Sequence, residues 1–400
     1  MRIAGIRSRV VQLPLDRPFQ PAWGRGRVQR SLVLVLLEVG TDDGLVGHGA
    51  AHGGLEAAVA LDRFVTPHLL GQDPAQVDRL AAVIRDAEIL GPPPYCMEIP
   101  LWDILGKAAG MPVHRLWGGA GDRVRAYCST GELRPARQRA EDVAALADAG
   151  FTAVKLRFHH DDPREDLAVA EAVREKAGDR IELMADANQA GADPGTGGHR
   201  VWDFRTALGV ARELERLGFH WLEEPLPRHD LDGLSRLRDR LETIKLAGGE
   251  DNHGLHEFRL LLERGCFDVL QPDAVKSETA SAIRKLAAFA ELGGVDVVPH
   301  TWGNGLGMLV HLHLAASLTN CGYLEFPHDP PSGLTASARD RMLTEPVTVD
   351  EEGFVQVPQR PGFGFVLDEE RIAHHTVHVI EQGDCGFARE DRGVSKGSAT

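Results

Sequence analysis

The sequence is poor in aromatic residues and has no long apolar run. Aromatic residues make up 6% of the 400 residues, so Leu, Val, Ile and Ala must form most of the core. No window approaches the ~18 uninterrupted apolar residues of a membrane-spanning helix, so no transmembrane segment is expected. The N-terminus alternates like a strand and lacks the apolar centre and the cleavage site of a signal peptide.

Cysteine and basic residues are also scarce. The five cysteines are scattered, without a CxxC or Cys/His cluster, which argues against a thiolate zinc site and predicts a cytoplasmic protein. The 44 Lys and Arg residues face 59 Asp and Glu residues, for a formal net charge of −15. No Lys/Arg run offers a surface for phosphates, so neither nucleic acid nor a membrane is an expected partner. The acidic balance by itself indicates only solubility.

The chain divides into regions of different rhythm. Residues 1–50 have the pattern of β strands with a Thr41–Gly44 turn, and helical periodicity follows over 55–70, 74–90 and 99–109. These segments predict an α+β unit over residues 1–122. Residues 350–384 return to strand and turn character and are expected to rejoin that unit. Residues 385–400 are rich in Gly, Ser and charge, which predicts a disordered tail.

Between these parts, residues 123–349 alternate short apolar runs with amphipathic helical stretches, at a spacing typical of strand–helix units. The runs lie at residues 124–128, 153–158, 181–187, 220–224, 244–249, 268–271, 295–300 and 322–326. Repetition of this kind implies parallel strands, and eight strands favour a closed barrel. An open doubly wound sheet is the competing fold, but no GxGxxG follows an early strand, so a dinucleotide-binding version has little support.

Ionisable residues stand where almost every predicted barrel strand ends. Lys155 and Arg157 share one side of their strand, and Asp186 and Asn188 are spaced in the same way. The later strand ends carry Glu223, Glu224, Glu250, Asp273, His300 and Glu325. A single Asp after a strand is more often a helix cap or turn former than a ligand, and a single His is usually a packed residue. Their convergence at one barrel end instead indicates a catalytic site.

Three carboxylates on successive strands form an all-oxygen set: Asp186, Glu223 and Glu250. Oxygen ligands suit one Mg²⁺ ion. Glu223 and Glu224 point in opposite directions, so only one of them can face the metal. Lys155 and Arg157 can supply the extra positive charge that an anionic substrate needs.

With these motifs in place, the sequence resembles the enolase superfamily, in its mandelate racemase-like subgroup. The ordered motifs are TDDG at 41–44, LWDILGK at 101–107, KxR at 155–157, DxN at 186–188, EEP at 223–225, GGE at 248–250, PDxxK at 272–276, PHTWG at 299–303 and the late Glu325. The resemblance covers nearly the whole chain. It implies a (β/α)7β TIM-like barrel with an α+β capping domain.

The resemblance implies a role for each matching residue. Asp186, Glu223 and Glu250 match the Mg²⁺ ligands, and Asn188 matches a substrate contact. Asp273 and His300 match an Asp–His dyad in which His300 is the base. Glu325 matches the acid that hydrogen-bonds the substrate carboxylate; together with Lys155 and the metal, its protonated form is expected to stabilise the enediolate.

The chain departs from the family pattern at two places. Racemising relatives carry a Lys base at the position of Arg157, and a guanidinium stays protonated. Dehydration of a sugar acid by His300 alone is therefore favoured, with epimerisation or cycloisomerisation as the alternative and a non-catalytic relative as a third possibility. At 277–279, Ser-Glu-Thr stands where relatives have a Gly pair, and the sequence offers no physical account of it. Lys276 is interpreted as structural.

The capping domain is expected to shape the substrate pocket. Trp23 and Tyr95 are the candidate substrate contacts, with His48 and His52 as weaker ones. The segment 192–200 is long for a connection between strand and helix and is expected to cover part of the mouth. The expected partner is a small carboxylate substrate, and a homo-oligomer is expected.

Overall fold

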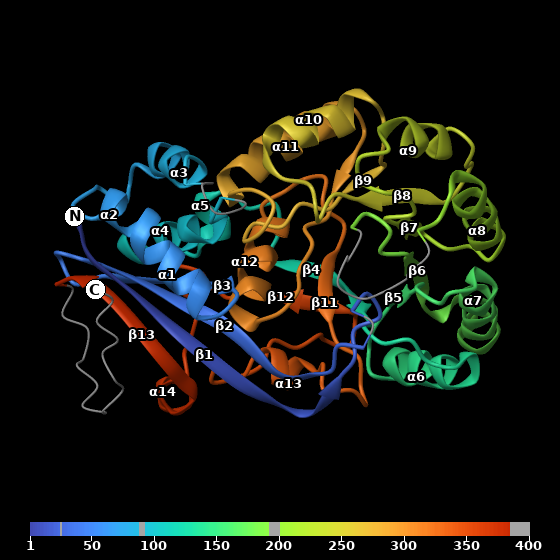
Figure 1. The fold of residues 1–400 in the computed structure, drawn as a ribbon, viewed down its shortest axis with the longest axis horizontal. Helices are drawn as coiled ribbons and strands as arrows, with labels where there is room; N and C mark the ends of the chain where they lie inside the picture. Colours follow the sequence, from blue (N-terminus) through green and yellow to red (C-terminus); the bar gives the residue numbers. More distant parts are fainter. Residues whose placement is uncertain (25, 88–92, 192–200, 385–400) are drawn as a thin grey trace.

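The computed structural model describes residues 1–24, 26–87, 93–191 and 201–384. A curled sheet of parallel strands ringed by helices forms one part, and an antiparallel sheet with its own helices lies against one side of it (Figure 1). This arrangement is the predicted TIM-like barrel with a capping domain. The predictions for the segments 192–200 and 385–400 lie outside the described residues. In the described part, no helix is both long and apolar enough to cross a bilayer.

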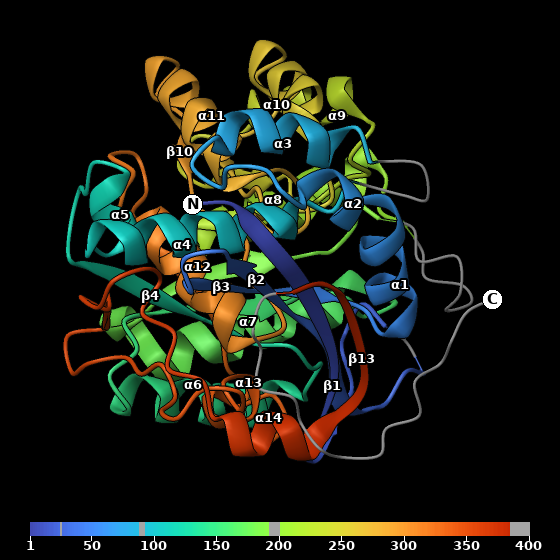
Figure 2. The same ribbon diagram turned by 90° about the vertical axis from the view of Figure 1, so that its left-hand side faces the viewer.

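The capping domain is built on the antiparallel sheet β13-β1-β2-β3. Its strands are β1 (Ile3–Phe19), β2 (Gln29–Thr41), β3 (Val46–His52) and β13 (Thr376–Gly383). Its helices are α1 (Leu55–Phe64), α2 (Thr66–Leu69), α3 (Val77–Arg85), the 3₁₀ turn η2 (Tyr95–Glu98), α4 (Ile99–Ala109) and α5 (Val113–Leu116). The C-terminal segment returns to this domain, because β13 pairs with β1 from Gly5↔Gly383 onward (Figure 2).

Local sequence signals explain most boundaries in this domain. The helix α4 ends where predicted, at Gly110, which takes the left-handed conformation with φ 64°. The single helix predicted over 55–70 is instead divided into α1 and α2. Pro67 lies in the first turn of α2 and has no N–H to continue the α1 ladder. The helix α14 (Glu369–His375) was not predicted, although Asp368 caps it by accepting from Arg371 N.

The barrel consists of eight parallel strands in the hydrogen-bonded order β10-β9-β8-β7-β6-β5-β4-β11. The strands are β4 (Arg123–Ser129), β5 (Ala153–Arg157), β6 (Glu182–Asp186), β7 (Trp221–Glu223), β8 (Lys245–Gly248), β9 (Val269–Leu270), β10 (Asp296–Val297) and β11 (Leu324–Pro327). The first and last of these, β4 and β11, pair directly. Between β10 and β11 the described residues form no ladder; the backbone there is joined from Val297 N to Asn320 O.

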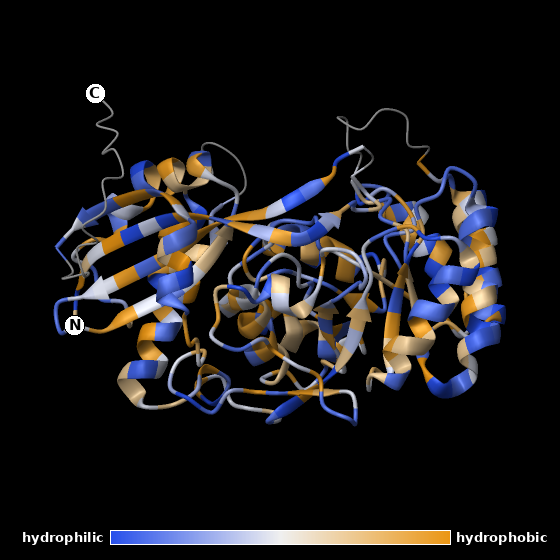
Figure 3. Ribbon diagram, turned by 90° about the horizontal axis from the view of Figure 1, so that it is seen from below, coloured by the Kyte–Doolittle hydropathy of each residue, from blue (hydrophilic) through white to orange (hydrophobic). Residues whose placement is uncertain are grey.

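Helices connect the strands and cover the outside of the barrel: α6 (Ala136–Asp148), α7 (Pro163–Ala177), α8 (Phe204–Arg216), α9 (Leu231–Arg238), α10 (Gly254–Glu263), α11 (Ala280–Leu292) and α12 (Gly305–Ala315). Most are amphipathic, with their apolar stripe toward the strands (Figure 3). The helix α12 differs, since all of its residues are buried. The smaller elements η3 (Gly178–Arg180), α13 (Ala336–Arg339) and β12 (Phe354–Gln356) complete the fold, and β12 pairs antiparallel with β4.

Large side chains fill the barrel interior below the site. The buried cluster inside the ring comprises Tyr127, Ala153, Met184, Trp221, Ala247, Val269, Val298 and Tyr323. Because side chains alternate along a strand, the residue two positions after Ala153, Met184 and Trp221 faces the same interior. Those residues are Lys155, Asp186 and Glu223, so the buried cluster packs directly against a layer of charged side chains.

Candidate active site

Neighbouring strands hold the candidate metal ligands in register. Asp186 pairs with Arg157 on one side and with Glu223 on the other, at the carboxyl ends of β5, β6 and β7. Oxygen atoms of Asp186, Glu223 and Glu250 lie within 4.8 Å of one another. Asp186 and Glu223 are fully buried, and burial together with Asp186 raises the pKa of Glu223. Buried carboxylates this close need a cation between them, and an all-oxygen set of this size fits a divalent ion such as Mg²⁺.

The two glutamates of the EEP motif point to different places. Glu223 joins Asp186 and also accepts a hydrogen bond from Gln271 Nε2 at 2.7 Å. Glu224 has a left-handed backbone with φ 45° and groups instead with Glu250 and Asp251. The sequence analysis assigned Glu223 to the metal cluster, and in the structure Glu223 lies with Asp186 and Glu250.

Lys155 lies at the centre of the charged layer and is completely buried. Its Nζ is 2.7 Å from Glu223 Oε1, 2.9 Å from Glu325 Oε1 and 3.5 Å from Asp186 Oδ2. Burial lowers the pKa of Lys155, but the charges of these carboxylates outweigh it and raise the pKa above its usual value. In the free site these carboxylates therefore favour the ammonium form of Lys155.

The Arg157 guanidinium is surrounded by hydrogen-bond acceptors and aromatic rings. Its guanidinium pairs with Asp186, donates to Thr130 O at 2.7 Å and to Ser129 Oγ at 3.1 Å. The ring of Trp23 lies 4.6 Å from Arg157 Cζ and that of Trp302 lies 5.1 Å away. Trp23, from the capping domain, therefore covers the Arg157 guanidinium with its ring. Trp302 was not singled out from the sequence, although it belongs to the PHTWG motif.

Asp273 and His300 follow the carboxyl ends of β9 and β10, respectively. His300 Nδ1 is 2.8 Å from Asp273 Oδ2, and His300 Nε2 is 3.2 Å from Glu250 Oε2. Burial lowers the pKa of His300, but Glu250, Glu325 and the hydrogen bond with Asp273 outweigh it and raise the pKa to about 9. Asp273 holds the proton of His300 on Nδ1 and leaves Nε2 facing the carboxylates. This is the geometry of an oriented general base.

Glu325 lies among cationic side chains in the free site. It accepts a hydrogen bond from Thr301 N at 2.8 Å and pairs with Lys155. Burial would raise the pKa of Glu325, but Lys155, His300 and Arg157 outweigh it and lower the pKa below its usual range. In the free site these cations favour the carboxylate form of Glu325, and its protonation when substrate is bound stays a prediction.

Asn188 and Tyr95, two candidate substrate contacts, both contact other residues of the protein. The Asn188 amide N donates to Asp186 Oδ1 at 2.8 Å and its Nδ2 to Asp186 Oδ2 at 3.2 Å, from a left-handed backbone with φ 47°. Asn188 thereby orients the Asp186 carboxylate. Tyr95 is only 2% exposed, and its hydroxyl lies beside Gly254 at the start of α10. Its place in the structure is between the capping domain and the barrel.

The segment Ser277–Thr279, which the sequence left without an account, has a clear place. Ser277 Oγ donates to Glu250 O at 2.8 Å and accepts from Asp273 N at 3.0 Å, so it joins a candidate ligand to the dyad. Glu278 pairs with Arg85 of α3 at 3.1 Å, and Thr279 caps α11. Lys276 Nζ lies 2.5 Å from Asp251 and 3.8 Å from Glu250, and its structural role stays a prediction.

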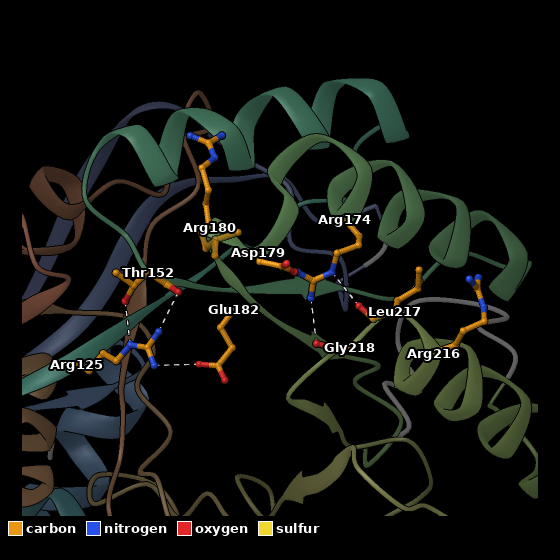
Figure 4. A pocket seen from close by; sticks show the side chains of 10 residues that line it. Arg125, Thr152, Arg174, Asp179, Arg180, Glu182, Arg216, Leu217 and Gly218 are labelled. Carbon is orange, nitrogen blue, oxygen red and sulfur yellow. Dashed lines mark hydrogen bonds and ion pairs between the residues drawn. The ribbon is translucent and has the colours of Figure 1, made fainter.

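A cavity of about 570 Å³ lies away from the candidate active site, at the amino-terminal ends of β4 and β6 (Figure 4). Arginines line it, but their donors are engaged. Arg174 donates to Leu217 O, Gly178 O and Gly218 O at 2.8 to 3.0 Å, and so satisfies the carboxyl ends of α7 and α8. Because helix carboxyl ends carry partial negative charge, this cavity is not suited to an anion.

Two family models together match most of the chain. Residues 5–118 match the mandelate racemase / muconate lactonizing enzyme N-terminal domain, and residues 138–371 match the enolase C-terminal domain-like family. The chain therefore belongs to the enolase superfamily, in its mandelate racemase-like subgroup.

Several relatives are named enzymes. D-galactarolactone cycloisomerase of Agrobacterium fabrum is 33% identical over 93% of this chain and 98% of that protein. Arabinonate dehydratase of Saccharolobus solfataricus is 29% identical over 86% of this chain and 90% of that protein. Among solved structures, L-talarate dehydratase from Polaromonas sp. JS666, complexed with Mg and L-glucarate, has a TM-score of 0.81 at 27% identity, covering 96% of this chain and 99% of that one.

Proposed function

We propose that this enzyme is a Mg²⁺-dependent dehydratase of sugar acids, which removes the proton next to the carboxylate and then eliminates the β-hydroxyl as water. The observation that carries the proposal is the asymmetry of the site. His300 with Asp273 is an oriented base on one face, whereas the opposite face presents Arg157, held by Asp186 and two tryptophans. A site with one base favours elimination over racemisation by two bases. Relatives named dehydratases of arabinonate, talarate/galactarate and D-xylonate support the same chemistry.

Asp186, Glu223 and Glu250 would hold the metal ion. Bound there, Mg²⁺ would supply positive charge beside the substrate carboxylate and neutralise Glu250, whose charge otherwise favours a protonated His300. A solved structure of a racemase from Streptomyces coelicolor with bound magnesium, 27% identical with a TM-score of 0.79, supports this choice of ion.

The residues of the chain divide the reaction between them. His300 Nε2 takes the α-proton, and the electron pair of the C–H bond moves into the enolate. Lys155, a buried ammonium ion, stabilises the charge that develops on the substrate carboxylate. His300, now an imidazolium paired with Asp273, returns the proton to the β-hydroxyl as the C–O bond breaks. Water leaves, and the resulting enol tautomerises to a 2-keto-3-deoxy acid.

The substrate contacts remain part of the proposal. Trp23 and Arg157 would form one wall of the substrate pocket. Asn188, beside Asp186, and Glu325, beside Lys155, would also contact the substrate. The buried position of Tyr95 favours an interdomain role over substrate binding. The homo-oligomer, the cytoplasmic location and the domain boundary at residue 122 stay predictions.

The test is a screen of aldonic and aldaric acids with Mg²⁺, in which 2-keto acid formation is detected by semicarbazide. The expected result is a keto product from at least one acid, lost in His300→Asn and after chelation of the metal. If no acid in a stereochemically complete set gives a keto product, the dehydratase proposal fails.

A cycloisomerase is the second candidate, because the 33%-identical relative and another at 29% carry that name. Product mass separates the two, since dehydration removes one water molecule and isomerisation leaves the mass unchanged. Sugar-acid lactones therefore belong in the same screen. A product of unchanged mass from a lactone would establish the second candidate.

A further inference from the structure

A second histidine, His311, contacts the Asp273–His300 dyad. His311 lies in the middle of α12 and is 1% exposed. Its Nε2 is 3.3 Å from Asp273 Oδ1 and 2.9 Å from the backbone N of Ala274, from which it accepts a hydrogen bond. The general family motifs in the sequence do not include this residue, and nothing in the reaction above uses it.

The Asp273 carboxylate is thereby held at both oxygens. Oδ2 takes the hydrogen bond from His300 Nδ1, whereas Oδ1 accepts from Val275 N at 2.8 Å and faces His311. Burial raises the pKa of Asp273, but His311 and His300 outweigh it and lower the pKa well below its usual value. We propose that His311 is a positioning residue, which fixes the rotation of the Asp273 carboxylate so that His300 keeps its proton on Nδ1 and presents Nε2 to the substrate. The inference rests on the proposed role of His300 as the base.

One ring nitrogen cannot accept from Ala274 and donate to Asp273 at the same time. The shorter distance, to Ala274 N, places the His311 proton on Nδ1, which has no hydrogen-bond partner among the described residues. In that tautomer His311 anchors the peptide that follows Asp273. In the other tautomer it donates to Oδ1 directly. The first arrangement restrains Asp273 through the peptide that follows it, and the second restrains its carboxylate directly. Removal of the ring removes the restraint in both cases.

The same helix offers a matched control. His313 is also buried, at 0% exposure, two residues further along α12. Its Nδ1 accepts from His114 N at 3.1 Å, and its ring packs 5.3 Å from those of His114 and Phe363. Among the described residues, His313 forms no hydrogen bond or ion pair with Asp273 or His300. A variant at His313 therefore removes a buried imidazole from α12 and leaves the dyad intact.

The test compares His311→Phe, His311→Gln and His313→Phe. The Gln amide can occupy the place of the imidazole Nε2, so this variant should keep most of the activity. Loss of a residue that orients a catalytic group typically costs about 10- to 100-fold. We expect His311→Phe to lower kcat by such a factor with KM unchanged, because substrate binding is not altered. His313→Phe should lower the thermal midpoint and leave kcat unchanged.

A measurement without substrate separates this inference from the proposed function. The Nδ1 proton of His300, hydrogen-bonded to Asp273, should give a low-field ¹H resonance that His300→Asn removes. The resonance should shift or broaden in His311→Phe, stay in place in His313→Phe and return in His311→Gln. If His311→Phe leaves both kcat and this resonance at wild-type values, or if His313→Phe reduces kcat equally, the inference is wrong. If the wild type dehydrates no sugar acid but the His300 resonance still shifts in His311→Phe, the proposed function is wrong and this inference stands.

Discussion

Glu98 gives the folded protein a pH dependence that can be measured. Its side chain is completely buried where η2 meets α11: Oε2 accepts from Ser281 N at 3.1 Å, and Oε1 has no hydrogen-bond partner within the described residues. Burial is the largest cause, and it raises the pKa of Glu98 from 4.5 to about 7, against the lowering effect of Ser281 and Arg85. Ionised Glu98 is therefore a cost to the interface between the two domains.

The sign follows from the raised pKa. The folded state binds the proton more tightly than the unfolded state, so the stabilisation is fully present below pH 4.5 and is lost as the pH rises through about 7. A raised pKa of this size corresponds to about 2 to 3 kcal/mol of unfolding free energy between pH 5 and pH 8.5. Glu98→Gln has no charge to bury and should not lose this contribution.

The assay is urea unfolding of wild type and Glu98→Gln from pH 5 to pH 8.5. The two proteins should have similar midpoints at pH 5, and the variant should be the more stable at pH 8.5. Glu351→Gln, which changes an exposed carboxylate, is the control and should follow the wild type throughout. A difference between wild type and Glu98→Gln that does not change with pH would refute the reasoning.

Three further predictions follow from the contacts of single side chains. Glu223→Gln should abolish Mg²⁺-dependent activity and Mg²⁺ binding in a metal titration, whereas Glu224→Gln should be milder; equal losses would mean that the assignment of the strand face is wrong. Arg174→Met should lower the unfolding free energy by about 1 to 3 kcal/mol, because three helix-end carbonyls lose their donor, with kcat unchanged; lost activity at full stability would contradict its structural role. Arg157→Lys should introduce exchange of the α-proton of the opposite epimer with D₂O, measured by NMR, and equally fast exchange of both epimers by the wild type would show that Arg157 is not the obstacle.

The barrel and the set of charged residues could be predicted from the sequence because both depend on short-range order. A strand exposes alternate residues to one side, so Lys155 and Arg157 on β5 had to share a direction. Asn188 lies beyond the end of β6 in a left-handed backbone and meets Asp186 through hydrogen bonds instead. Parallel strands joined by helices place their carboxyl ends at one face, and this brought Asp186, Glu223 and Glu250 together.

Only the tertiary structure decided how these charges are paired and which other residues support them. Trp23 and Trp302 enclose Arg157 although they lie far from it in the sequence, and Lys155 lies 2.9 Å from Glu325, whose pKa it lowers. His311 reaches Asp273 across the packing of α12 against the loop after β9. Periodicity fixes the direction of a side chain relative to its own strand or helix. The distance between side chains on separate elements, and hence their charge state, depends on how those elements pack.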